Sequence, residues 1–130
     1  MVNTKLELRN LKRFEAPLEN EISQLYFNYV GHHLSAVSCT FLQNLELIIF
    51  MEGTRSPLEN FLETQGDAIL ARRMRDAINQ IIKGKLYQTI ERGFSLSSAR
   101  VAFLEPTSSE KLSLIVTFNP FEQSGEAHQN

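Results

Sequence analysis

Residues 37–51 read VSCTFLQNLELIIFM, and this stretch indicates the fold. In its first part, apolar side chains alternate with Ser38 and Thr40, which is the period of a β-strand. Residues 45–51 again place every second side chain on one apolar face, so they form a second strand. The two residues 43–44 between the strands are few enough for a hairpin turn. The stretch therefore predicts an antiparallel hairpin.

A second hairpin is expected near the C-terminal end of the chain. Apolar side chains alternate through residues 99–103 and again through 112–118, and residues 106–109 supply turn-forming side chains between them. Pro120 lacks the N–H that further strand pairing needs, so the last strand should end before it. The two hairpins together predict a four-stranded antiparallel sheet.

Two shorter helices are predicted outside the hairpins. The first begins near Pro17 and ends at Gly31, a residue that adopts a positive φ at little cost. Its expected apolar stripe consists of Leu18, Ile22, Leu25 and Tyr29. Ser56 and Glu59 have the spacing of a capping box, which opens a short helix through Leu62.

The longest helix follows a second capping pattern at residues 64–67 and ends at Gly93. Gly84 predicts a bend or a break within it. Its apolar face is expected to consist of Leu70, Met74, Ala77, Ile78 and Ile81. The resulting order α-β-β-α-α-β-β is typical of an α+β protein with its helices on one face of a four-stranded antiparallel sheet.

Composition indicates an ordinary globular domain. The chain has 130 residues, 42% hydrophobic and 22% charged, and a net charge of -2 that offers no overall attraction to nucleic acid or anionic lipid. We expect one domain over residues 1–120, beginning with a basic segment at 1–15, and a flexible polar tail at 121–130. The sequence shows neither a membrane-spanning stretch nor a signal peptide, so a cytoplasmic location is expected.

The sequence offers no recognisable catalytic or metal-binding constellation. His32 and His33 are adjacent, and adjacent side chains diverge, so they are poorly placed to chelate one metal ion. Cys39 alternates with apolar neighbours and is expected to be a buried, unreactive thiol. Glu59 is engaged by the predicted helix cap, and no Ser-His-Asp spacing is present. We therefore expect no enzymatic activity, no metal and no cofactor.

A basic cluster lies on the longest helix. Arg72, Arg73 and Arg75 are close in sequence, and Arg55 precedes the capping box, so together they form a candidate anion-binding surface. The alternative is a solvated helix face, and nucleic acid is the weaker option because aromatic side chains do not alternate with these cations. Arg75 lies nearest to the apolar positions of the helix. We expect it to be buried and paired with a carboxylate, with Arg72 and Arg73 exposed.

The second face of the predicted sheet is unusually apolar. If Leu47 and Leu114 face the helices, the opposite face carries apolar side chains as well, where a solvated face should be polar. These side chains are Leu42, Ile48, Phe50, Ala102, Leu104 and Ile115. We expect a second subunit to cover this face, with Leu42, Ile48, Phe50 and Ile115 at the interface of a homodimer.

From about Glu21 to Asn119 the chain resembles the MpsC family. The matching segments are the turn at residues 31–34, the Gly-Thr-Arg-Ser-Pro-Leu-Glu run at 53–59, Arg75 on the long helix, and the closing hairpin at 98–118. His32 and His33 stand where other members carry an arginine and a second glycine. The resemblance implies an accessory or regulatory protein of a cation-translocating, membrane-potential-generating system linked to inorganic carbon uptake.

Two functional hypotheses follow. The first is a non-enzymatic accessory module that forms a homodimer and binds a protein partner, such as a membrane complex. The second is a regulatory domain that binds a small anion or nucleic acid through Arg55, Arg72, Arg73 and Arg75. Salt dependence separates them, because binding to phosphates weakens steeply with salt and an apolar interface does not.

Overall fold

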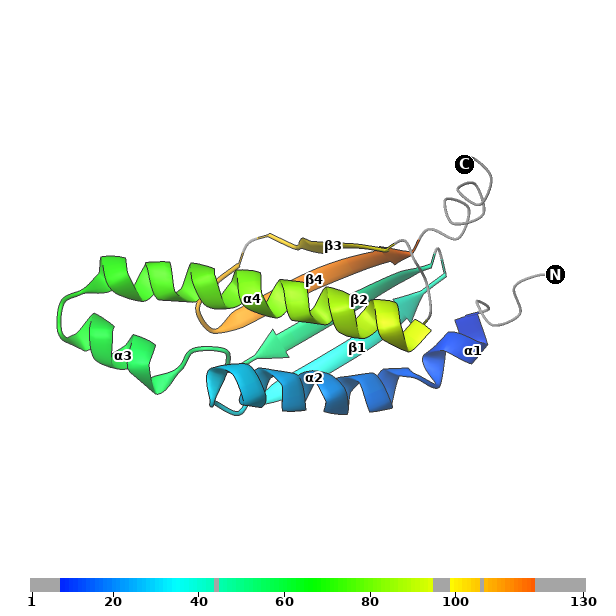
Figure 1. Ribbon diagram of the computed structural model, residues 1–130, viewed down its shortest axis with the longest axis horizontal. Helices are drawn as coiled ribbons and strands as arrows, with labels where there is room; N and C mark the ends of the chain where they lie inside the picture. The colour runs from blue at the N-terminus through cyan, green and yellow to red at the C-terminus, as the bar shows by residue number, and fades with distance from the viewer. Residues whose placement is uncertain (1–7, 44, 95–98, 106, 119–130) are drawn as a thin grey trace.

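The computed structural model describes residues 8–43, 45–94, 99–105 and 107–118. Its elements are, in chain order, α1 (Leu8–Lys12), α2 (Glu15–Val30), β1 (Ala36–Leu42), β2 (Glu46–Glu52), α3 (Pro57–Thr64), α4 (Ala68–Phe94), β3 (Ala99–Phe103) and β4 (Lys111–Phe118) (Figure 1). The predicted α+β class and element order are confirmed, with α1 as an additional short helix inside the expected basic segment. The expected tail at 121–130 lies outside the described residues.

The four strands form one antiparallel sheet in the order β1-β2-β4-β3. The two hairpins are joined through β2 and β4, where Ile49 lies opposite Leu114, while Cys39 lies opposite Ile49 on the other side of β2. Because successive side chains alternate between faces, this register places one complete apolar set on the same side of the sheet. The predicted division of the strands between two faces is therefore correct.

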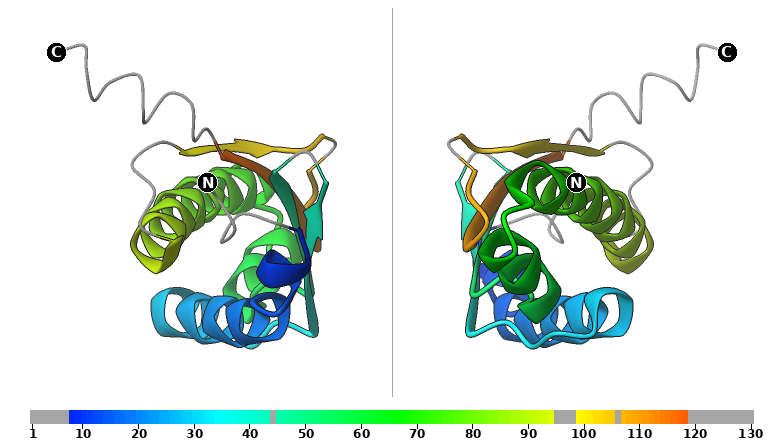
Figure 2. Two further views of the ribbon diagram at one scale, coloured as in Figure 1. Left: turned by 90° about the vertical axis from the view of Figure 1, so that its right-hand side faces the viewer. Right: turned by 90° about the vertical axis from the view of Figure 1, so that its left-hand side faces the viewer.

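The helices α2 and α4 lie on the same side of the sheet, and the opposite side faces outward (Figure 2). The core fills the space between them. From the sheet it takes Cys39, Phe41, Leu47, Ile49, Met51, Leu112, Leu114, Val116 and Phe118, and from the helices Leu11, Leu18, Ile22, Tyr26, Ile82, Leu86 and Ile90. These buried side chains supply the main apolar contribution to folding.

Helix α2 begins at Glu15, two residues before the predicted start, and ends as expected at Gly31. Gly31 has a φ of 77°, and its N–H donates to the carbonyl of Phe27. The buried stripe is Leu18, Ile22 and Tyr26, so Tyr26 takes the place that was predicted for Tyr29. This stripe faces β1 and α4, the elements against which α2 packs.

The predicted apolar face of α4 is only partly correct: Met74 and Ile78 are half-buried, and Ile78 packs against the core. Leu70 and Ile81 are 45% and 52% exposed, whereas Ala71, Arg75 and Asn79 are buried together with Ile82 and Leu86 further along the helix. The helix is rotated from the predicted orientation because Arg75 and Asn79 hydrogen-bond to polar partners inside the protein. A hydrophobicity pattern alone places such polar residues in solvent. Helix α4 also continues without a break through Gly84, where a bend or break was expected.

Candidate functional site

A buried ion pair joins α3 to α4. The Arg75 guanidinium donates from Nη2 to Oε1 of Glu59 at 2.6 Å and from Nε to Oε2 at 2.9 Å. Arg75 is 5% and Glu59 is 2% exposed. Two parallel hydrogen bonds between charged groups are stronger and more directional than a single contact, so this pair fixes the angle between the two helices.

The remaining donors of Arg75 bond to other parts of the fold. Its Nη2 donates to the carbonyl of Thr54 at 2.7 Å, and its Nη1 donates to Oδ1 of Asn79 at 3.0 Å. The Tyr26 hydroxyl lies 3.4 Å from both Nη atoms and itself donates to the Thr54 carbonyl at 2.5 Å. Helices α2, α3 and α4 and the segment before α3 therefore meet at one guanidinium.

Glu59 has a second role in the cap of its own helix. Its Oε1 accepts from the Ser56 N–H at 2.9 Å, and the Glu59 N–H donates to the Ser56 hydroxyl oxygen at 3.3 Å. This is the predicted capping box, with Pro57 as the first helical residue. One carboxylate thus satisfies both a helix terminus and a buried cation, which explains how it tolerates complete burial.

The pKa directions show that the cluster favours its charged state. Burial alone raises the pKa of Glu59, but the hydrogen bonds from Arg75 and from the Ser56 N–H together hold it below its usual value. Burial alone lowers the pKa of Arg75, and the bonds to Glu59 and Tyr26 raise it above its usual value. For Tyr26 burial dominates, so its pKa is raised. The Glu59 carboxylate and the Arg75 guanidinium therefore each stabilise the charged form of the other.

A hollow of about 420 Å³ opens beside this cluster, between α3, the first half of α4 and the loop before β4. Its lining carries three cations and three carboxylates. These charged residues are Arg55, Arg72, Arg75, Glu59, Glu63 and Asp76. Thr107, Ser108 and Ser109 add hydroxyl groups on the loop side. The lining is therefore balanced in charge, and it does not present the excess of positive charge that would concentrate an anion.

The structure brings together three of the four predicted anion-binding residues. Arg55, Arg72 and Arg75 line the hollow, while Arg73 is exposed on α4 outside it. Arg55 pairs with Glu63, and its Nη1 lies 3.7 Å from Glu110, while its Nε has no hydrogen-bond partner among the described residues. The prediction that Arg75 is buried and paired, with Arg72 and Arg73 exposed, is confirmed.

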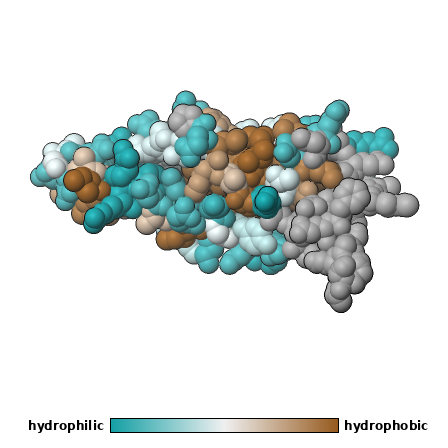
Figure 3. All heavy atoms as spheres, turned by 90° about the horizontal axis from the view of Figure 1, so that it is seen from above, coloured by the Kyte–Doolittle hydropathy of each residue, from teal (hydrophilic) through white to brown (hydrophobic). Residues whose placement is uncertain are grey.

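The predicted interface residues lie on the outward face of the sheet. Ile48, Phe50 and Ile115 are half-buried between their strand neighbours, and Leu42 is 37% exposed. Ile48 lies opposite Ile115, so the centre of this face is a contiguous apolar strip. Seen over β3 and β4, apolar side chains gather at the surface (Figure 3). We call the patch formed by Leu42, Ile48, Phe50 and Ile115 the outer patch.

The histidines and the cysteine have structural surroundings. Nε2 of His32 lies 3.0 Å from the Gly53 carbonyl, and the His33 ring stacks on Phe27 with centroids 4.2 Å apart. Cys39 is buried in the core, and burial, followed by the nearby Glu19 and Glu15 carboxylates, raises the pKa of its thiol to about 12. Among the described residues, no three His, Cys, Asp or Glu side chains form a group suited to a metal ion.

The family model described as "Na+-translocating membrane potential-generating system (MpsC)" matches residues 10–102. This chain belongs to the MpsC family. The match in this MpsC protein runs from α1 to β3 and includes both members of the Glu59–Arg75 pair and the Gly53–Glu59 segment. No curated protein and no solved structure matches the chain. No helix in the described part of the MpsC chain is long and apolar enough to cross a lipid bilayer.

Sequence reasoning missed three members of the buried cluster in this MpsC protein. They are Tyr26, the Thr54 carbonyl and Asn79. Tyr26 continues the spacing of Leu18 and Ile22 by one more step of four, and Asn79 follows Arg75 by four, so both lie on predictable faces. The Thr54 carbonyl carried no signal, because any residue supplies the same backbone group.

Proposed function

We propose that this MpsC protein is a non-enzymatic accessory or regulatory module of a membrane potential-generating system, and that it forms a homodimer and binds a protein partner. Family membership supports the link to that system. The observation that carries the proposal is the outer patch, an apolar area on a sheet face that no described helix covers. Proteins rarely leave such a face in contact with water.

The layout of the outward face favours a second copy of the same chain as its occupant. Its middle rows are neutral, with Ile48 opposite Ile115 and Phe50 opposite Ser113, while charges occur at the strand ends, with Glu52 opposite Lys111 and Glu46 opposite Thr117. An apolar centre within a charged rim is the usual anatomy of a protein interface. A two-fold axis through the centre of the patch would bring the outer patch of one subunit against the outer patch of the other, so the same surface serves both subunits.

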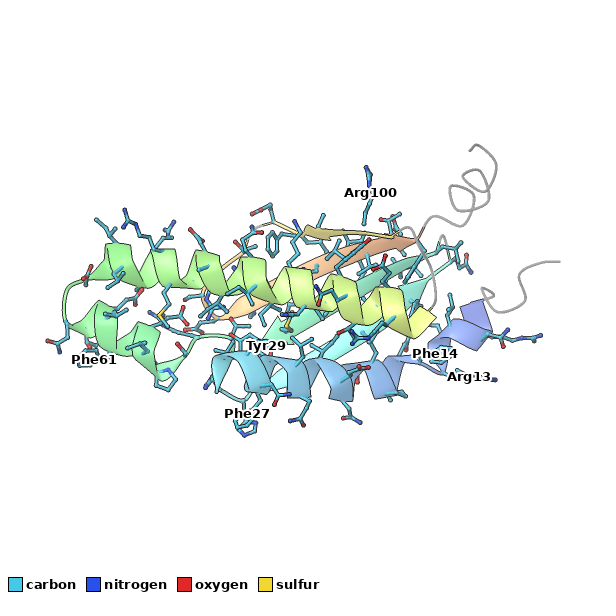
Figure 4. All side chains as sticks on the ribbon, viewed as in Figure 1. Arg13, Phe14, Phe27, Tyr29, Phe61 and Arg100 are labelled. Atoms are coloured by element: carbon cyan, nitrogen blue, oxygen red, sulfur yellow. The ribbon has the colours of Figure 1, made fainter. Side chains whose placement is uncertain are left out.

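The test is the mass of the protein in solution. Sedimentation of the wild type should show a dimer, and Phe50→Glu should shift it toward the monomer because a carboxylate would be buried without a partner. Phe61→Glu is the matched control, since Phe61 is 57% exposed on α3 at the far end from the sheet (Figure 4). A wild type that remains monomeric at near-millimolar concentration would contradict dimerisation.

The accessory role needs a cellular measurement. Cells that lack the protein should generate a smaller sodium-dependent membrane potential, and the wild-type gene should restore it. Phe50→Glu should restore it poorly, whereas Phe61→Glu should restore it fully. An unchanged potential in the deletion strain would contradict the role in a membrane potential-generating system without affecting the dimer. The alternative function, anion or nucleic-acid binding, gains no support from a hollow whose lining charges are balanced.

A further inference from the structure

Strand β3 ends the sheet, and its backbone pairing leaves one side unused. The Leu104 N–H donates to the Ser113 carbonyl at 2.9 Å, just beyond the pair Phe103–Leu114. Antiparallel ladders alternate, so Arg100 and Ala102 also bond to β4, and the N–H and C=O groups of Val101 point away from it. No described residue pairs with those two groups of Val101. Such an edge is a template for one more strand.

A hollow of about 720 Å³ lies along this edge. Helix α4 supplies Gln80, Lys83, Gly84 and Tyr87; β3 supplies Arg100, Val101 and Ala102; β4 supplies Ile115 and Thr117. Gly84 has no side chain and the space where a Cβ atom would lie is open, so the helix wall is low at this point. The hollow therefore combines an apolar floor with unpaired backbone groups, which is the composition of a site for an extended peptide.

The two charged side chains that line this hollow, Lys83 and Arg100, are of one sign. Lys83 has its Nζ 5.0 Å from the centre of the Phe103 ring, and Arg100 is exposed and projects from β3 away from the body of the protein (Figure 4). No carboxylate belongs to the lining, and Glu91, which accepts from the Tyr87 hydroxyl, lies outside it. This contrasts with the balanced hollow beside Arg75. A partner segment with acidic side chains would be complementary.

We propose that the free edge of β3 and this hollow bind an extended, acidic segment of a partner protein, which adds to the sheet as a fifth strand. The inference deepens the partner-binding part of the proposed function. It does not depend on dimerisation, although Ile115 belongs both to this hollow and to the outer patch. A second copy of the chain is the poorer occupant, because pairing β3 with β3 would bring the Lys83 and Arg100 cations of both copies together.

The test is an NMR titration of the full chain with an acetylated hexapeptide in which aspartate and valine alternate. Amide shifts should concentrate at Val101, Phe103 and the α4 residues of the hollow. Arg100→Gln and Lys83→Gln should each weaken binding about two- to fivefold at low salt, the range typical of exposed charge pairs. Arg73→Gln removes an exposed cation from another part of α4 and should leave the affinity unchanged.

Two further measurements isolate the backbone contribution. The same peptide with N-methylated amides should lose most of its affinity, because it cannot complete the ladder. Val101→Pro should also abolish binding, since it removes an N–H that points away from β4. Equal binding of a lysine–valine peptide, equal binding of the methylated peptide, or shifts confined to other surfaces would overturn the proposal. Concentration-dependent shifts at Val101 without peptide in the Phe50→Glu variant would do the same, because they would show self-pairing through β3 and not association through the outer patch.

Discussion

The Glu59 carboxylate accepts two hydrogen bonds from the Arg75 guanidinium, sixteen residues further along the chain, and also caps the helix that carries it. A buried ion pair of this kind is not in itself a large source of stability, because both charges lose their hydration. Its effect is to define one arrangement of α2, α3 and α4, since the guanidinium contacts Tyr26 on α2 and Glu59 on α3 as well as the Thr54 carbonyl before α3. Four predictions follow from the geometry around this pair and in the core.

Removing one member of the pair should be far more costly than replacing both. Arg75→Met leaves the Glu59 carboxylate buried without its cation, and should lower the free energy of unfolding by about 3–5 kcal/mol. The double variant Glu59→Gln/Arg75→Met should recover part of that loss, because no uncompensated charge remains. Urea denaturation of the wild type and the variants measures both values. A loss in the double variant equal to the sum of the losses in Arg75→Met and Glu59→Gln alone would show that the two residues are not coupled.

Stability should fall at acidic pH through Glu59. Its pKa is lower in the folded protein than in the unfolded chain, so its contribution is fully present above the unfolded value of about 4.3 and is lost as the pH falls through the folded value. The free energy of unfolding, measured from pH 7 to pH 3, should therefore decline less steeply in Glu59→Gln than in the wild type. Parallel profiles would assign the acid sensitivity to other carboxylates.

Gly53 should tolerate no side chain. Its φ is 77°, and a Cβ atom would lie 2.5 Å from Oγ and 2.8 Å from the backbone N of Ser35. Gly53→Ala should therefore cost more than the roughly 1 kcal/mol expected for the backbone conformation alone. Gly66→Ala is the control for that smaller cost, since Gly66 has a φ of 85° and open space around it. Similar thermal midpoints for the two variants would show that Ser35 moves aside freely.

Cys39 should be unreactive in the folded protein. Burial raises the pKa of its thiol to about 12, and the thiolate is the reactive form. Iodoacetamide at pH 8 should modify the native protein orders of magnitude more slowly than the urea-unfolded protein, as followed by mass spectrometry. Cys39→Ser should abolish the modification in both states. Rapid labelling under native conditions would mean that β1 opens frequently at the edge of the sheet.

The local sequence determined the strands and the start of α3. Residues 37–51 alternate so regularly that any slip by one position would expose the Leu47 and Ile49 face, and Ser56 and Glu59 form a cap from neighbouring atoms alone. Arg75 was also predictable as the arginine of the basic cluster that shares a helix face with Ile82 and Leu86. These features depend on short-range geometry, which the chain specifies without knowledge of distant contacts.

Only the tertiary structure decided which face of α4 is buried and which backbone groups remain free. Asn79 is buried and Ile81 exposed because the Glu59 carboxylate and the Thr54 carbonyl draw the Arg75 side of the helix inward, and hydrophobicity alone predicts the reverse. The outward-pointing N–H and C=O groups of Val101 are free because β4 pairs with β2 on one side and with β3 on the other, which leaves β3 at the edge of the sheet. Both outcomes rest on hydrogen bonds between segments far apart in the chain, and a residue's own polarity carries no information about partners that only folding brings near.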